Sequence, residues 1–395
     1  MDRRAFVRLV GGGVVLAAGV SAAGCSSEIP DEAVRAWQGP GGEADLRRWI
    51  LAHAILAPHS HNLQSWLVDL RTPGEIVLRC DLERLLPETD PFSRQIMMSQ
   101  GTFIELLELA ARERGQRTEI TLFPEGAPGP DKPDARPVAR IRLVGNPGDA
   151  AVTKDPLFAQ IFKRRTNRNA YEARAVPAAA WTSMAEAVKP LAPQQEFAFG
   201  FVGADRADSA EAIARHRAIA NEAWRIEIVT PHTMFESIKV LRVGAREIAQ
   251  HRDGISITSP MLVALDKLGL FDRSKPPAPD STAAKSQIET FAKAIASTQG
   301  FLWITSRGNQ RATQVNAGRA WARVQLAGTA QGVVMQPISQ ALQEYKEMAG
   351  PYAEVHRLLG AAQPAETVQM WARVGFAAPV GPAPRRGLEA HLVKA

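Results

Sequence analysis

The segment from residue 57 to residue 66 reads APHSHNLQSW and joins an expected helix to an expected strand. Apolar residues recur at helical spacing from Glu43 onward, and Pro58 ends that helix. Asn62 and Gln64 then offer hydrogen-bond donors and acceptors together. Polar groups at such a junction can face a ligand, so this segment is a candidate binding segment.

A second segment, residues 164–168, reads RRTNR. Arg164 and Arg168 are four residues apart, so on a helical turn they would share one face and could clamp one phosphate. An arginine-rich helix end is more often a solvated face or a cap, and the segment alone leaves both interpretations open.

Hydrophobic patterning outside these segments predicts a mixed chain. Strands are expected over residues 66–70, 75–80, 117–123, 137–144, 196–202, 300–305 and 368–376. Helices are expected over residues 92–115, 155–163, 177–188, 204–228, 234–250 and 309–332. Residues 260–279 are rich in proline and are expected to be irregular. Helices and strands alternate twice without the crossover rhythm of a parallel sheet, which predicts an α+β fold with two related halves.

Composition excludes several classes of protein. The 395 residues hold 47 Lys+Arg against 41 Asp+Glu, a formal charge of +6. Without residues 1–25 the count is 44 against 40, or +4, because Arg3, Arg4, Arg8 and Asp2 lie there. So small a surplus does not mark a nucleic-acid-binding protein. Two cysteines exclude a disulfide framework, and beyond residue 25 no apolar run reaches the ~18 residues that span a bilayer.

Residues 1–25 have the features of an export signal. Arg3 and Arg4 precede a moderately apolar, glycine-rich stretch, which resembles the twin-arginine (Tat) pattern. Ala22-Ala23-Gly24-Cys25 resembles a lipoprotein cleavage box, so Cys25 is expected to carry a lipid. A transmembrane anchor is the alternative, but the run is short. We therefore expect Tat export to the periplasm or cell envelope, with anchoring through Cys25.

The remaining cysteine and a histidine group have simpler interpretations. Cys80 ends the expected strand over residues 75–80 and is expected to be a buried thiol. His59 and His61, with His53 as a third ligand, could bind a metal ion. No nearby carboxylate or cysteine completes a recognisable ligand spacing, so no metal site is expected.

Taken together, the two segments resemble the nitroreductase superfamily of flavin enzymes. In the first segment, Ala57, Pro58, Asn62, Leu63, Gln64 and Trp66 match the family segment that contacts the flavin ring, whereas His59 and Ser65 replace its Ser and Pro. In the second, Arg164, Arg165 and Arg168 match the segment that holds the FMN phosphate. Residues 317–332, 334–340, 374–376 and 384–386 resemble later family segments.

The resemblance implies an FMN cofactor on which the chemistry takes place, with no catalytic side chain. It assigns the phosphate to Arg164, Arg165, Arg168 and Arg385 or Arg386. It assigns the ring surroundings to Pro58, His59, Ser60, Asn62 and Gln64. It also implies that the backbone of Pro337, Ile338, Ser339 and Gln340 reaches flavin N5 or the ring face.

The order of the two segments implies a fused dimer. In the family they come from different subunits, whereas here each occurs once, the first in residues 43–150 and the second in residues 151–395. We therefore expect a tether over residues 26–42, two nitroreductase-like halves forming an intramolecular pseudo-dimer, and one FMN between them in a monomer. A lid-like insertion is expected around residues 230–280. This arrangement is similar to the Acg-like branch of single-chain relatives.

The expected activity is transfer of hydride or electrons through FMN between a small-molecule donor and acceptor. Little NADH or NADPH is present outside the cytoplasmic membrane, so an exported flavin-binding or sequestering protein without NAD(P)H-dependent turnover is the alternative. A flavin-free solute-binding lipoprotein is a third interpretation. The physiological donor and acceptor are not encoded in any motif.

Overall fold

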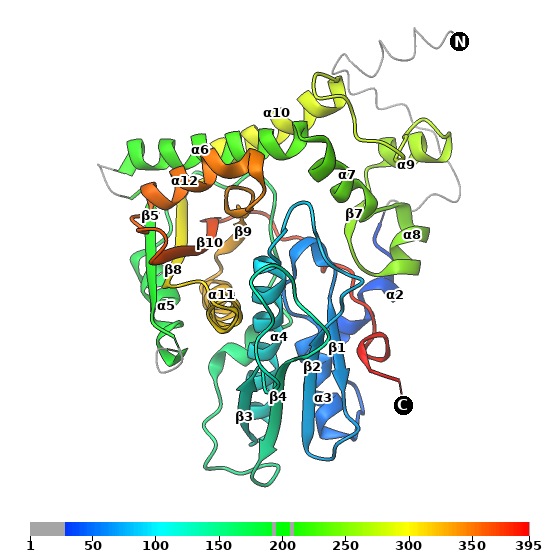
Figure 1. Cartoon of the computed structure of the whole chain (residues 1–395), viewed down its shortest axis with the longest axis vertical. Coiled ribbons are helices and arrows are strands. Elements are labelled where there is room, and N and C mark those ends of the chain that lie inside the picture. The colour runs from blue at the N-terminus through cyan, green and yellow to red at the C-terminus, as the bar shows by residue number, and fades with distance from the viewer. Residues whose placement is uncertain (1–27, 192–194, 206–208, 395) are drawn as a thin grey trace.

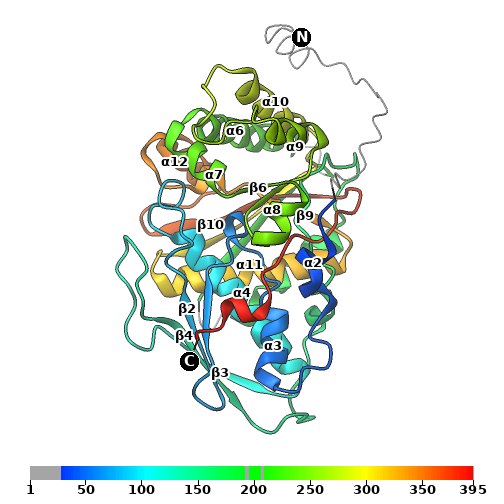
Figure 2. The ribbon, with the colours of Figure 1, turned by 90° about the vertical axis from the view of Figure 1, so that its right-hand side faces the viewer.

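The computed structural model describes residues 28–191, 195–205 and 209–394. The expected leader and Cys25 lie outside the described residues. Two four-stranded antiparallel sheets flank a pair of long central helices, and a layer of helices covers one end of the molecule (Figure 1 and Figure 2). The mixed fold class predicted from the hydrophobic pattern is confirmed.

The first sheet has the strand order β1-β2-β4-β3. Its strands are β1 (Trp66–Asp69), β2 (Glu75–Cys80), β3 (Arg117–Leu122) and β4 (Pro137–Val144). Every second side chain of β2 is buried, which is the alternation expected when one face packs on a core. Helix α3 (Leu46–Ala54) precedes β1 and is capped by the Asp45 carboxylate, which accepts from the backbone of Arg47 and Arg48. All four strands lie where they were predicted.

The second sheet repeats this strand order as β5-β8-β10-β9. Its strands are β5 (Phe197–Gly203), β8 (Gly300–Arg307), β9 (Val334–Pro337) and β10 (Glu366–Gly375). Helix α5 (Ala178–Glu186) precedes β5 as α3 precedes β1. The chain therefore visits the strands of both sheets in the same sequence. Strand β9 was not predicted, because its four residues are too few to show a periodic pattern.

The two central helices, α4 (Arg94–Glu113) and α11 (Arg311–Ala330), contact each other through their backbones. A Cβ atom on Gly101 of α4 would lie 1.8 Å from the carbonyl oxygen of Val315, and one on Gly318 of α11 would lie 1.8 Å from that of Met98. Glycine alone permits this approach. Each helix begins with an arginine and has its crossing glycine at the eighth position.

Buried charges also join the central helices. Glu105 of α4 accepts hydrogen bonds from Arg319 (2.9 Å) and Arg323 (2.7 Å) of α11. Arg323 also donates to Asp155 at 2.8 Å. Buried charges are tolerated when they are paired in this way, and the geometry of the pairs specifies the register of the two helices.

An insertion of helices separates β5 from β8. Its elements are α6 (Ser209–Val229), α7 (Pro231–Lys239), β6 (Leu241–Val243), α8 (Gly244–His251), β7 (Ile255–Ile257), α9 (Pro260–Lys267) and α10 (Thr282–Ala296). The single helix predicted over residues 234–250 is wrong. Gly244, with φ at 75°, interrupts it, and β6 pairs with β7 instead. Residues 260–279, expected to be irregular, include α9.

The tether expected over residues 26–42 is structured in its middle. Helix α2 (Asp31–Val34) and the 3-10 helix η1 (Arg35–Gln38) lie there, and Trp37 donates its indole N–H to Ala383 O at 2.8 Å. The other short elements are η2 (Ser60–Asn62), η3 (Pro156–Gln160), η4 (Lys189–Leu191), η5 (Gln340–Leu342), η6 (Lys346–Met348), α12 (Ala349–Leu358) and η7 (Leu388–His391). Among the described residues, no helix combines the length and apolar character needed to cross a membrane.

Candidate cofactor site

Residues 57–66 follow α3 in an unusual backbone conformation. They are called the ring-contact segment below, after the role that the sequence resemblance implies. It contains η2, and φ is positive at His61 (46°), Asn62 (55°) and Gln64 (55°). Left-handed φ values are uncommon in residues other than glycine. Such backbone conformations persist only when surrounding contacts impose them, and they cluster at functional sites.

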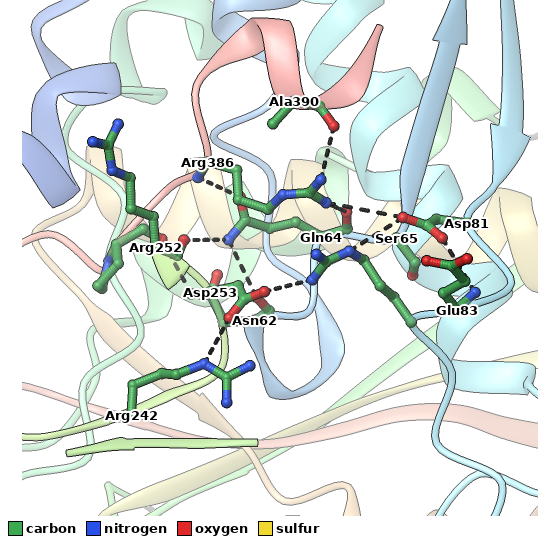
Figure 3. A network of polar contacts seen from close by, with 12 residues as sticks. Asn62, Gln64, Ser65, Asp81, Glu83, Arg242, Arg252, Asp253, Arg386 and Ala390 are labelled. Carbon is green, nitrogen blue, oxygen red and sulfur yellow. Dashed lines mark hydrogen bonds and ion pairs between the residues drawn. The ribbon is translucent and has the colours of Figure 1, made fainter. Parts of the chain in front are cut away.

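The side chains of Gln64 and Asn62 impose this conformation. Gln64 is fully buried; its amide donates to Asn62 O (3.2 Å) and Arg252 O (2.9 Å), and its carbonyl accepts from Arg386 N (2.9 Å) (Figure 3). Asn62 donates to Pro384 O (3.1 Å) and accepts from the Arg385 guanidinium (2.6 Å). The sequence suggested both side chains as ligand contacts. In the structure they instead hold the ring-contact segment against the carboxy-terminal segment, residues 384–386.

The insertion also docks on the ring-contact segment. Gly254 N donates to Asn62 O at 3.2 Å, next to the contact between Arg252 and Gln64. The buried Asp253 carboxylate accepts from Arg242 of the insertion (Figure 3). It also accepts from Arg84, which follows β2. Residues 241–257 are thereby tied to the candidate site by charged hydrogen bonds.

Replacing Asp253 with asparagine should loosen this connection. The change removes the charge that two guanidinium groups share, and hydrogen bonds to charged groups contribute about 1.5–3 kcal/mol each. We expect faster hydrogen–deuterium exchange at β6 and β7, with exchange at the central helices unchanged. Exchange at β6 and β7 equal to that of the wild type would contradict this role for Asp253.

Pro58, His59 and Ser60 are half-buried, and each also makes hydrogen bonds within the protein. Pro58 O accepts from Thr102 Oγ at 2.7 Å, and Ser60 N donates to Ser99 Oγ at 3.2 Å. His59 Nε2 lies 2.6 Å from Ser65 Oγ. Burial lowers the pKa of His59 to about 3, so its imidazole is neutral.

His61 was not singled out as a flavin contact, yet it has a buried Nδ1 atom without a hydrogen-bond partner in the described part of the chain. Burial, followed by the nearby charge of Arg168, lowers its pKa to about 4. A neutral imidazole with a free ring nitrogen can donate to or accept from a ligand. A ligand-binding histidine and a structural histidine look the same in a sequence. Only the surroundings of His61 in the structure therefore mark it as a candidate ligand contact.

Three arginines gather around Trp37. The guanidinium carbons of Arg164, Arg165 and Arg385 lie 5.9, 4.2 and 5.3 Å from the centre of its ring. Arg164 and Arg385 both donate to Leu56 O, at 3.2 and 3.3 Å, where the ring-contact segment begins. The second segment and the carboxy-terminal segment therefore meet at the first one.

This arginine cluster (Arg164, Arg165 and Arg385) has no counter-charge. No carboxylate among the described residues lies within ion-pair distance of any of the three, and the Nε atoms of Arg164 and Arg385 are buried without a partner. Burial and then the neighbouring cation Arg165 lower the pKa of Arg164 to about 9. Burial and then Arg164 lower the pKa of Arg385 well below its ordinary value. An anion at this position would remove the repulsion and satisfy the free N–H groups.

Arg168 lies apart from the arginine cluster. Residues 164–168 are not helical, because Thr166 pairs with Met335 in a β-bridge, so the shared helical face expected for Arg164 and Arg168 does not form. The Arg168 side chain is exposed, yet desolvation by surrounding protein lowers its pKa. The charge of Arg168 also lowers the pKa of His61, which places the two side chains near each other.

The segment from Pro337 to Gln340 lies next to the arginine segment. Pro337 ends β9, and Asn167 N donates to Met335 O at 3.0 Å two residues earlier. Ile338 is fully buried and donates to Trp371 O, and Ser339 O accepts from Gln95. The structure thus brings together all four segments named from the sequence.

Arg386 differs from its neighbour. Its side chain donates to Ala390 O (2.7 Å) and lies 4.0 Å from Asp81, on the side of Gln64 (Figure 3). Arg385, not Arg386, therefore joins Arg164 and Arg165. A cavity of about 240 Å³ reaches Arg385, and its lining has mixed charge, with Arg35, Arg48 and Arg252 beside Glu32 and Glu43.

Two other candidate side chains lie away from open space. His53 Nδ1 hydrogen-bonds Trp49 O at 2.9 Å, and burial lowers its pKa. No group of three or more His, Cys, Asp or Glu side chains among the described residues is arranged to hold a metal ion. Cys80 ends β2 as a buried thiol, as predicted, and burial raises its pKa.

Comparison with known proteins agrees with the motifs at the level of a superfamily. No family model matches the chain. Two Mycobacterium tuberculosis proteins, from strains H37Rv and CDC 1551, are each 25% identical over 359 residues, which is 88% of this chain and 90% of theirs. Both are provisionally named NAD(P)H nitroreductases. This similarity spans both sheets and supports a relationship to nitroreductases.

Solved structures with partial similarity are nitroreductases as well. An FMN- and NADPH-dependent nitroreductase, NfnB, from a Sphingopyxis-type strain HMH aligns with 61% of this chain and 99% of its own, at 15% identity and a TM-score of 0.38. The FMN-dependent NfnB of Mycobacterium smegmatis, solved with NADPH, aligns with 60% of this chain and 96% of its own, at 20% identity and a TM-score of 0.35.

Proposed function

We propose that this chain is an FMN-binding oxidoreductase of the nitroreductase superfamily. The observation that carries the proposal is the arginine cluster of Arg164, Arg165 and Arg385, which lacks a carboxylate partner and lies against the ring-contact segment. Arg164 and Arg385 are buried, and Arg165 is half-buried. A phosphate fits the free Nε–H groups of Arg164 and Arg385, because guanidinium N–H groups are strong donors to phosphate oxygens. The Nη groups of Arg385 already donate to protein oxygens, including those of Leu56 and Asn62. The named relatives of 25% identity support the same assignment.

We further propose that one flavin lies between two fused halves. The equal strand orders of the two sheets support an internal duplication, as do the matching arginine and glycine positions of α4 and α11. The ring-contact segment occurs only in the first half and the arginine segment only in the second. A single complete site per chain follows, and a monomer suffices to form it.

In this proposal, FMN supplies two-electron chemistry, and the protein binds and orients it. The arginine cluster holds the phosphate, and Arg168 and His61 face a separate part of the cofactor. Asn62 and Gln64 act indirectly by fixing the strained backbone of the ring-contact segment. The backbone of residues 337–340 supplies polar groups beside Arg168. No side-chain nucleophile is required.

Export by the Tat pathway, lipid attachment at Cys25 and an envelope location are part of the proposal, as is a place in the Acg-like branch.

One observation favours the alternative of a flavin-holding protein: residues 252–254 of the insertion contact the ring-contact segment directly. An insertion in this position can restrict the approach of a bulky donor such as NADPH.

The test begins with the visible spectrum of protein purified from its native host. We expect a yellow protein that releases FMN in a 1:1 ratio on denaturation. A colourless protein that does not take up added FMN would overturn the proposal and favour a solute-binding role. Anaerobic NADPH then separates the two flavin-dependent functions: rapid bleaching and acceptor-dependent reoxidation support an oxidoreductase, and an unreduced flavin supports holding or another donor.

A further inference from the structure

A cluster of buried polar side chains lies between the insertion and the segment after β9. It is formed by Glu227 of α6, Gln340 and Gln343 around η5, and Tyr345. Glu227, Gln343 and Tyr345 are 4%, 4% and 7% exposed. Glu227 Oε2, Gln340 Oε1, Gln343 Oε1 and Tyr345 OH are buried and lack a hydrogen-bond partner in the described part of the molecule. The Glu227 carboxyl interacts with the side chains of Gln340 and Gln343, and each of the three side chains keeps one oxygen without a partner. Buried oxygens of this kind are normally satisfied by internal water.

Gln340 connects this cluster to the candidate cofactor site. This residue ends the segment 337–340, and η5 packs against α6. The Glu227 side chain interacts with both Gln340 and Gln343. Side-chain contacts therefore connect α6 to Gln340, at the end of the segment proposed to contact the flavin.

The charges around Glu227 favour its neutral form. Glu236 of α7 is the charged group that acts on it, and no lysine or arginine among the described residues forms an ion pair with it. Glu236 is itself held by the backbone N–H groups of Glu88 and Thr89. Glu347 of η6 acts on Tyr345, and no described group of α10 or α12 shifts Glu227. Burial raises the pKa of Glu227 to about 7.

We propose that Glu227 is a proton-relay group for the reaction at the flavin, acting through Gln340 and internal water. The inference rests on the proposed function. It does not make Glu227 a ligand of the cofactor, since Gln340 stands between them. Glu227 lies on the insertion, so this role gives the insertion a chemical purpose in addition to covering the site.

The proton balance shows why a relay is needed. Reduction of a quinone to a quinol consumes two electrons and two protons. A hydride from the reduced cofactor accounts for both electrons and one proton. The second proton comes from Glu227: its carboxyl O–H bond breaks, an O–H bond forms on the quinone oxygen, and the carboxylate regains a proton from water.

Infrared difference spectroscopy on FMN-loaded protein tests the relay without turnover. The variants are Glu227→Gln and, as a matched control on the exposed side of the same helix, Glu222→Gln. We expect a protonated-carboxyl band that changes on flavin reduction in the wild type and in the control and is absent from Glu227→Gln. The same band in Glu227→Gln would assign it to another acid, such as the buried Asp90, and overturn the proposal.

The pH profile of reoxidation provides a second readout. With a benzoquinone as acceptor, the wild-type rate should fall as pH rises through about 7. Glu227→Gln should be at least about tenfold slower below that pH and nearly pH-independent. If Glu227→Gln binds flavin and has the pH profile of the wild type, the relay is refuted and the proposed function stands. If the wild type binds no FMN, the proposed function itself is refuted. If Glu227→Gln does not fold, Tyr345→Phe should shift the carboxyl band; an unshifted band would overturn the proposal.

Discussion

Replacing Arg164 and Arg385 together with alanine should weaken FMN binding by about 100-fold or more. Each charge-assisted hydrogen bond contributes about 1.5–3 kcal/mol, so loss of two guanidinium groups corresponds to roughly 3–6 kcal/mol in binding. The two side chains are buried together beside Trp37 without a carboxylate, so the phosphate is their proposed partner. Fluorescence titration of apoprotein with FMN measures the effect.

Riboflavin makes this experiment specific to the phosphate. Wild-type protein should prefer FMN strongly, and the double variant should bind FMN and riboflavin almost equally. Arg386→Ala is the matched control: its side chain is directed to Ala390 and Asp81, so the preference for FMN should persist. Retention of full FMN affinity by the double variant would exclude the arginine cluster as the phosphate site.

Replacing Gly101 with alanine should prevent stable folding. The added Cβ would meet the Val315 carbonyl carbon at 2.8 Å and its oxygen at 1.8 Å, and backbone cannot move aside by changing a rotamer. Overpacking a core usually costs about 1–3 kcal/mol. Here the helices must separate along their whole contact, including the Glu105 ion pairs, so we expect a larger loss and little soluble protein.

Gly350→Ala in α12 is the control for helix propensity. A Cβ there meets nothing within 4 Å, so alanine should leave stability unchanged or raise it by up to about 1 kcal/mol. Thermal melts of both variants, with and without FMN, compare the two sites. A Gly101→Ala protein with a wild-type melting temperature would show that the central helices do not cross as closely as the structure has them.

Local patterns predicted most of the elements because their causes are local. Residues 75–80 alternate in burial as a strand does, and the long apolar face of residues 94–113 requires a helix. The insertion was predicted poorly. Gly244 divides one apparent helix, because tertiary pairing of β6 with β7 overrode helical periodicity there. Helix α10 was not predicted at all.

The sequence by itself determined the mixed fold and named the segments that are proposed to form the candidate site. Only the tertiary structure decided how those segments divide their roles. It placed Arg385 rather than Arg386 beside Arg164, separated Arg168 from both, and brought Trp37 from the expected tether into the cluster. The physical reason is that spacing along a chain specifies neighbours only within a helix or strand, whereas a buried charge is positioned by packing between distant segments.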